Sequence, residues 1–154
     1  MSFEEIRVIT VVYLAVFLPL LIYFQNKNRL PSWVPTFYII GVIVCALGWE
    51  LWFTYGWLDG DSVNLRRSEV LNNWLPKNIN WLMNSMGDAG AVLLGGAWIM
   101  WLSHKKDVKV FKEWKWSAFC ILLIWCIGQN ILVEMFLYHD QLAEGKPLSW
   151  APLS

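Results

Sequence analysis

Three carboxylates stand inside long apolar stretches of this chain, where an ionisable side chain is expensive to bury. They are Glu50, Asp88 and Glu134. A charged group near the centre of a membrane span costs roughly 2.5–3.5 kcal/mol on insertion scales, so such residues mark functional sites by default. Carboxyl groups also carry out the proton transfers of isomerisation and hydration reactions. We therefore interpret these three residues as candidate catalytic acids and bases.

Amide side chains accompany the carboxylates at helical spacing. Asn80, Asn84 and Asp88 follow one another at intervals of four, which places them on one helix face about 40° apart at each step. Asn130 and Glu134 are also four residues apart. Tryptophans and two loop arginines lie near these groups in the predicted fold. The candidate ligand-binding residues are Asn80, Asn84, Gln129, Asn130, Trp49, Trp81, Arg66 and Arg67.

The composition indicates that membrane helices position these groups. Hydrophobic residues make up 57% of the 154 residues and charged residues 16%, whereas a soluble domain has about 25% charged residues. A helical span needs ~20 apolar residues, and four stretches meet this requirement. We predict an all-α, four-transmembrane-helix up-down bundle, formed by a single integral membrane domain (residues 1–154) with spans at about 6–24, 35–55, 79–102 and 116–138.

The distribution of lysine and arginine predicts the orientation of the bundle. The loops after the first and third spans share one side and hold seven basic residues: Lys27, Arg29, Lys105, Lys106, Lys109, Lys112 and Lys115. The other side holds five over a much longer sequence: Arg7, Arg66, Arg67, Lys77 and Lys146. Because basic loops stay cytoplasmic, both termini and the loop 56–78 are predicted to be non-cytoplasmic.

In such a bundle the polar residues converge in the outer halves of three spans. Glu50, Asp88 and Glu134 then lie at similar depths, while the inner halves carry almost nothing polar. The loop 56–78 is expected to form a short amphipathic helix, capped by Asp61 or Ser62 and ended by Pro76, that lies at the interface or covers the pocket. Gly87, Ala91 and Gly95 are expected to form one small-residue packing face on the third span.

Several functional classes are excluded or disfavoured. Net charge is zero, so nothing suggests a nucleic-acid partner. The cysteines Cys45, Cys120 and Cys126 form no C-x-x-C pair, which gives no redox or zinc signature. The only histidines are His104 and His139, and no ligand spacing predicts a metal or a cofactor.

The expected function is that of a multi-pass membrane protein with an intramembrane polar pocket. The pocket is expected to bind a hydrophobic, lipid-like or terpenoid small molecule, with acid–base transformation of that molecule as an open question. The alternative is a non-enzymatic subunit or assembly factor, with a homo-oligomer or a membrane complex as partner. A proton channel ranks last, because the inner halves look sealed. The basic turn 104–115 is expected to rest on lipid headgroups, and recognition of a specific anionic lipid is a further alternative.

Overall fold

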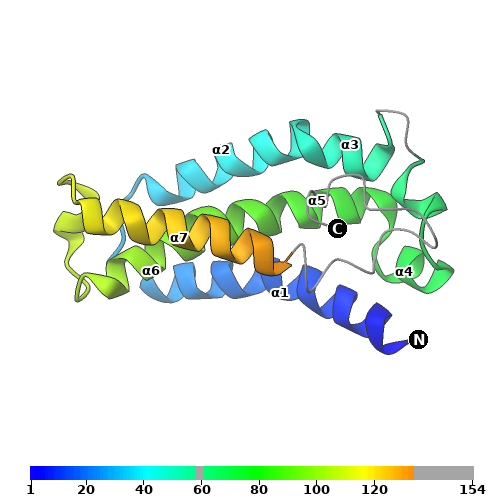
Figure 1. Ribbon diagram of the computed structural model, residues 1–154, viewed down its shortest axis with the longest axis horizontal. Helices are drawn as coiled ribbons and strands as arrows, with labels where there is room; N and C mark the ends of the chain where they lie inside the picture. The colour runs from blue at the N-terminus through cyan, green and yellow to red at the C-terminus, as the bar shows by residue number, and fades with distance from the viewer. Residues whose placement is uncertain (58–60, 134–154) are drawn as a thin grey trace.

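The computed structural model describes residues 1–57 and 61–133, and in these residues every regular element is a helix. The helices form long rods that lie side by side along one axis (Figure 1). Their bounds are α1 Phe3–Asn26; α2 Val34–Leu47 with α3 Trp49–Tyr55; α5 Lys77–Ala89, η2 Gly90–Gly95 and α6 Gly96–Ser103; and α7 Trp116–Leu132. The all-α prediction is confirmed.

Two of these rods are long and apolar enough to cross a membrane, namely Phe3–Asn26 and Lys77–Ser103. The bent pair α2 and α3 makes a third when it is counted as one span. Helix α7 is apolar but has 17 residues, and the remainder of the predicted fourth span lies outside the described residues.

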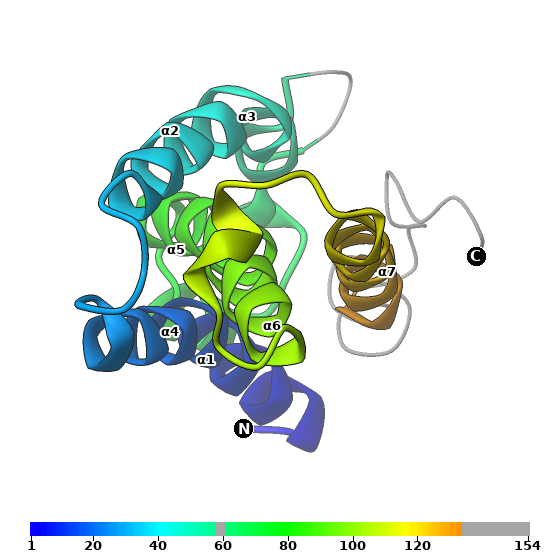
Figure 2. The same ribbon diagram turned by 90° about the vertical axis from the view of Figure 1, so that its left-hand side faces the viewer.

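The rod formed by α5, η2 and α6 is the centre of the bundle. Seen from the end, α1, α2 and α7 surround it (Figure 2), and it packs against each of them. Glycines permit the close approach: a Cβ added at Gly87 would lie 3.1 Å from Ala15 of α1, and one at Gly41 of α2 would lie 2.5 Å from Leu93. The rod that carries Asp88 is therefore the one against which α1, α2 and α7 pack.

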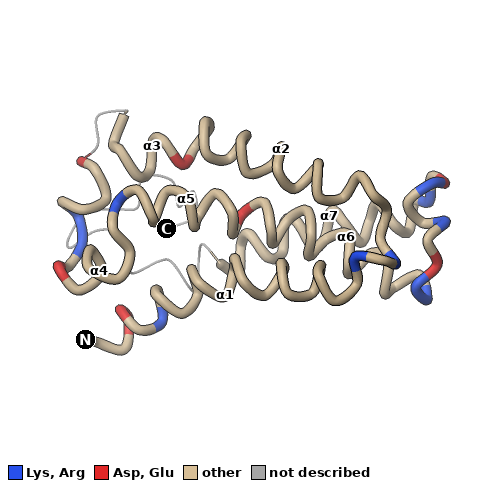
Figure 3. Tube along the Cα trace, turned by 180° about the vertical axis from the view of Figure 1, so that it is seen from behind, with Lys and Arg blue, Asp and Glu red and all other residues tan. Residues whose placement is uncertain are grey.

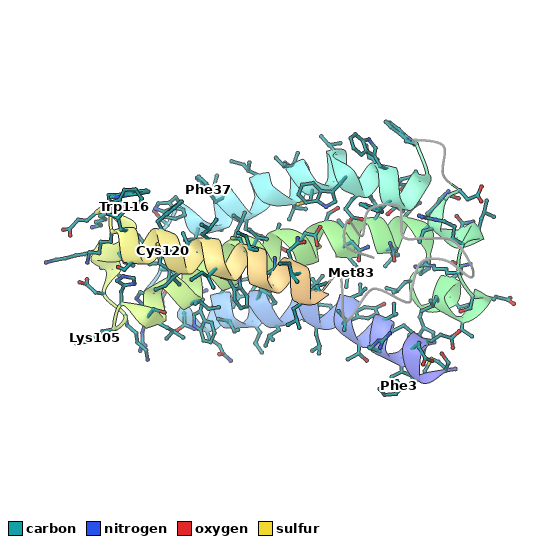
Figure 4. All side chains as sticks on the ribbon, viewed as in Figure 1. Phe3, Phe37, Met83, Lys105, Trp116 and Cys120 are labelled. Atoms are coloured by element: carbon teal, nitrogen blue, oxygen red, sulfur yellow. The ribbon has the colours of Figure 1, made fainter. Side chains whose placement is uncertain are left out.

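Helix α1 begins with a capping box and buries one narrow stripe. The Ser2 hydroxyl accepts from the Glu5 N–H at 3.2 Å, and the Glu5 carboxylate accepts from the Ser2 N–H at 2.7 Å. Val8, Val12 and Val16 recur at intervals of four and are buried. Large apolar residues on the rest of the surface, such as Phe37 of α2, point away from the bundle, whereas Met83 points inward (Figure 4). An outward apolar surface of this kind suits lipid.

A break at Gly48 divides the second rod. The axes of α2 and α3 differ by 45° there, and the Gly48 N–H still reaches the Val44 carbonyl at 2.9 Å. A Cβ at position 48 would lie 2.7 Å from that same carbonyl oxygen, so only glycine fits. The break leaves carbonyls of α2 without helical partners, and the Trp81 indole N–H donates to one of them, Ala46, at 2.8 Å.

The central rod contains a π-helix, Gly90–Gly95, between α5 and α6. A π turn holds an extra residue and displaces the regular hydrogen bonds. The Trp125 indole N–H of α7 donates to the Ala91 carbonyl at 2.8 Å, and its ring lies against Gly95. Gly87 packs on α1 instead. The predicted single face of Gly87, Ala91 and Gly95 is therefore divided between two neighbouring helices.

The loop after α3 folds into two short pieces instead of the single predicted helix. They are η1 Val63–Leu65 and α4 Glu69–Trp74. Ser62 stands before η1, but the cap of α4 is Ser68, whose hydroxyl accepts from the Leu71 N–H at 3.4 Å. Leu71 and Leu75 are buried against the valines of α1, which places this loop over one end of the bundle, hereafter the α4 end.

Candidate functional site

The candidate site is centred on a hydrogen bond between two irregular points of the fold. Asp88 lies one residue before the end of α5, and the π-helix begins two residues after it. Trp49 is the first residue of α3, directly after the break at Gly48. The Trp49 indole N–H donates to the Asp88 carboxylate at 2.8 Å. One bond thus joins the broken rod to the central rod.

Glu50 follows Trp49 and is 5% exposed. The hydroxyl of Thr54, one turn further along α3, donates to its carboxylate at 3.4 Å. The Cys45 thiol of α2 is close enough to Glu50 and Asp88 to interact electrostatically with both. The structure therefore brings Trp49, Glu50 and Asp88 to one region, and away from the two ends of the bundle the acidic residues lie on α3 and α5 (Figure 3). We call Trp49, Glu50 and Asp88 the acidic junction.

The other candidates on α5 extend from the junction toward the α4 end. Trp81 donates to the Ala46 carbonyl, as described above, and its ring meets the Tyr55 ring edge-on at 6.3 Å. Asn80 is buried and accepts from Arg67 at 2.8 Å. Asn84 is half-buried between Asn80 and Asp88, and no hydrogen bond joins it to another described residue. Unlike Asn80, Asn84 therefore has a side-chain amide that makes no hydrogen bond within the described residues.

Arg67 fastens the loop to the central rod. Besides Asn80, it donates to the Asn72 side-chain oxygen at 2.8 Å and to the Leu75 carbonyl. Leu75 follows directly after α4, where carbonyls lack helical partners. The Arg67 guanidinium therefore already donates hydrogen bonds to acceptors within the protein. If Arg67 also contacts a ligand, as predicted, it does so while holding the loop to α5.

Arg66 points to the neighbouring helix and donates to the Phe53 carbonyl of α3. Burial lowers the pKa of the Arg66 guanidinium from its usual value, and the negative charge of Asp61 acts in the opposite direction. An arginine stays protonated at physiological pH despite such a shift. The positive charge of Arg66 is therefore held close to α3, which also carries Glu50.

The candidates from the last helix are only partly placed. Gln129 donates to the Cys126 carbonyl at 3.3 Å, and Asn130 is exposed. Helix α7 packs on α6 and η2. Glu134 lies outside the described residues. Polar residues were predicted to converge from three helices. In the described part of the chain, those that meet come from α3 and α5.

Sequence reasoning did not identify several residues that build this region. The Tyr38 hydroxyl of α2 donates to the Met86 carbonyl at 3.4 Å, close to Asp88 along α5. Thr54 and Trp125 were also not predicted. A hydroxyl or a tryptophan inside an apolar run resembles any membrane residue, so these had no sequence signal. The glycines in Gly90–Gly96 were a sequence signal from which an irregular helix could have been predicted.

No group of three potential metal ligands from His, Cys, Asp and Glu occurs among residues 1–57 and 61–133. Comparison with protein-family models, curated proteins and solved structures finds no match to this chain. Any function assigned to the acidic junction therefore rests on its own residues.

Proposed function

We propose that the chain is a four-span membrane protein with both termini and residues 56–78 on the non-cytoplasmic side. The support is two long apolar rods, a bent apolar pair and the apolar helix α7. The loops 27–33 and 104–115 lie together at the end opposite α4, where basic residues gather (Figure 3). This end, hereafter the lysine end, corresponds to the cytoplasmic side under the positive-inside rule.

We propose further that the acidic junction binds a lipid-like or terpenoid small molecule. The observation that carries this proposal is the hydrogen bond between Trp49, directly after a helix break, and Asp88, two residues before a π-helix. Irregular backbone within a membrane is tolerated where it is buried in protein or lines a cavity, and π segments recur at functional sites. Aromatic and apolar neighbours with a few convergent polar groups are typical of ligand sites.

The chemistry available to this site is proton transfer. Asp88 or Glu50 in its acid form can donate a proton to an unsaturated carbon, and the other carboxylate can remove a proton from a neighbouring carbon. That pair of steps moves a double bond. Asn84 is placed to orient the substrate, and Glu134 remains a third candidate acid.

The test compares the full-length wild type with Asp88→Asn, both purified in nanodiscs formed directly from the host membrane. Small molecules that co-purify are extracted and quantified by mass spectrometry. We expect at least about a tenfold loss of one retained apolar molecule, because a lost charge-assisted hydrogen bond costs about 1.5–3 kcal/mol. Asp107→Asn makes the same chemical change at the lysine end and serves as the control. Equal retention by wild type, Asp88→Asn and the control would show that the junction binds no such molecule.

A second candidate, a subunit of a larger membrane assembly, is favoured by one feature of α7. Its residue Asn130 is exposed, and a Cβ added at Gly128 would meet nothing within 4 Å. Exposed polar side chains and exposed small residues on a lipid-facing helix are each typical of helix–helix contacts in membranes. Native mass spectrometry of the nanodisc sample distinguishes the two: a stable heteromeric mass supports the subunit, and a lone or self-associated chain with a bound molecule supports the ligand site.

A further inference from the structure

Helix α6 ends in a turn whose residues are unusual for its shape. The Lys105 N–H donates to the Leu102 carbonyl at 3.1 Å, and the Lys106 N–H donates to the Trp101 carbonyl at 2.9 Å. These two bonds define a Schellman motif, which normally has glycine at its left-handed position. Here Lys105 and Lys106 have φ values of 57° and 63°. Two lysines thus occupy a backbone conformation that L-residues adopt at a cost.

A buried donor lies close to this turn. Trp101 is 2% exposed, and its indole N–H has no hydrogen-bond partner among the described residues. The Lys106 ammonium lies 5.9 Å from the centre of the Trp101 ring. A buried N–H without an acceptor is rare, because the loss of hydration is not recovered. An oxygen-bearing anion at this turn would supply both the acceptor and the counter-charge.

The segment that follows is pinned to the bundle by its apolar residues, so its lysines face outward. Asp107 caps η3 Val108–Phe111 by accepting from the Lys109 N–H at 2.9 Å. Val110 is buried with Met100 and Ala118. The lysines at positions 105, 106, 109 and 112 are exposed. Trp116 points outward at the edge of this end (Figure 4), as tryptophans do at headgroup depth.

We propose that this basic turn, residues Trp101–Lys112, binds the phosphate of an anionic phospholipid headgroup. The Trp101 N–H and the Lys106 ammonium contact the phosphate, and Lys105 and Lys109 supply further positive charge. Charge complementarity and interfacial position favour a lipid over a protein partner, since clusters of four or more basic residues beside a span attract anionic lipids. The inference rests on the membrane placement proposed above and is independent of the acidic junction.

The test measures lipid binding to the delipidated full-length chain in neutral detergent by native mass spectrometry. Phosphatidylglycerol is titrated against phosphatidylcholine, and inorganic phosphate is added as a competitor. Each lysine near a charged surface changes the binding affinity about fivefold. We therefore expect Lys106→Gln to bind phosphatidylglycerol about fivefold more weakly, with no change in its affinity for phosphatidylcholine. Lys77→Gln is the matched control, because Lys77 also lies over an aromatic ring, that of Tyr55, at 5.2 Å but at the α4 end.

The result that supports the proposal is a preference for phosphatidylglycerol that falls in Lys106→Gln and Trp101→Phe and persists in Lys77→Gln. No preference, or equal losses in Lys106→Gln and Lys77→Gln, would overturn it. Full competition by inorganic phosphate would also overturn it, because the source would then be a free anion. If Lys106→Gln does not fold, the wild type still decides: selective binding that does not weaken with added salt contradicts a site made of lysines.

Discussion

At the scale of single residues, indole N–H groups connect the rods of this molecule. Trp49, Trp81 and Trp125 each donate to an oxygen on a neighbouring helix, at 2.8 Å in every case. Two of the acceptors are backbone carbonyls beside the helix break and within the π-helix. Lipid offers such carbonyls no hydrogen-bond donor, so a side chain from another helix has to supply it. Tryptophan does this while its ring fills apolar space.

Trp125→Phe tests this role, because it removes the donor to Ala91 while keeping an aromatic ring against Gly95. We expect the free energy of unfolding to fall by about 1 kcal/mol, the usual size of a hydrogen bond between membrane helices. Titration of the micelle-embedded protein with sodium dodecyl sulfate measures it. The control is Trp116→Phe, since Trp116 is exposed and has no such acceptor among the described residues. A loss as large in the control as in Trp125→Phe would mean that ring contacts, not the hydrogen bond, stabilise α7.

At the scale of helices, each residue of the Trp49–Asp88 hydrogen bond lies beside an irregularity of its own rod. The break at Gly48 directs Trp49 and Glu50 of α3, and the π-helix begins two residues after Asp88. Regular helices in both rods would continue the faces of α2 and α5 without interruption, and Trp49 would follow the axis of α2. The 45° change of axis therefore sets the contact between Trp49 and Asp88.

Gly48→Ala should weaken that contact. A Cβ there would lie 2.7 Å from the Val44 carbonyl, which is backbone and cannot rotate away. We expect a destabilisation of about 1–3 kcal/mol, typical of overpacking, measured in the same detergent titration. Gly128→Ala is the matched control, since nothing lies within 4 Å of its added Cβ and alanine favours a helix. Equal stability of the two variants would show that the break relaxes at no cost.

The sequence allowed the helices and the acidic residues to be predicted, but not the way they meet. Glu50 and Asp88 were recognisable because ionisable groups interrupt apolar runs. The break and the π-helix were not predicted, since helical periodicity assumes regular geometry throughout. Arg67 was predicted to contact a ligand, and in the structure its guanidinium donates to Asn72, Asn80 and Leu75. A loop arginine near amides has the same sequence pattern whether its acceptor belongs to a ligand or to the fold.

At the scale of the whole molecule, the two ends differ in their charge (Figure 3). At the α4 end polar bonds accompany the buried Leu71 and Leu75: the Ser68 hydroxyl donates to Glu5 at 2.5 Å, and the Tyr13 hydroxyl donates to the Trp74 carbonyl at 3.1 Å. At the lysine end the buried side chains are apolar, including Val110 and Ala118, and the charges are exposed and mainly positive. Because the positive charge is concentrated at one end, the proposed orientation can be tested by finding which end faces the cytoplasm.

The orientation predicts which end reacts with a reagent that cannot cross the membrane. In a variant whose three cysteines, Cys45, Cys120 and Cys126, are replaced by alanine, single substitutions Asp61→Cys and Lys109→Cys place one thiol at each end. A membrane-impermeant maleimide added to intact cells should label the first and leave the second unlabelled until the cells are permeabilised. The basic residues at the lysine end, which favour the cytoplasmic side, are the cause of this expected difference. The opposite pattern would reverse the topology, and labelling of both variants in intact cells would contradict the membrane placement of the bundle.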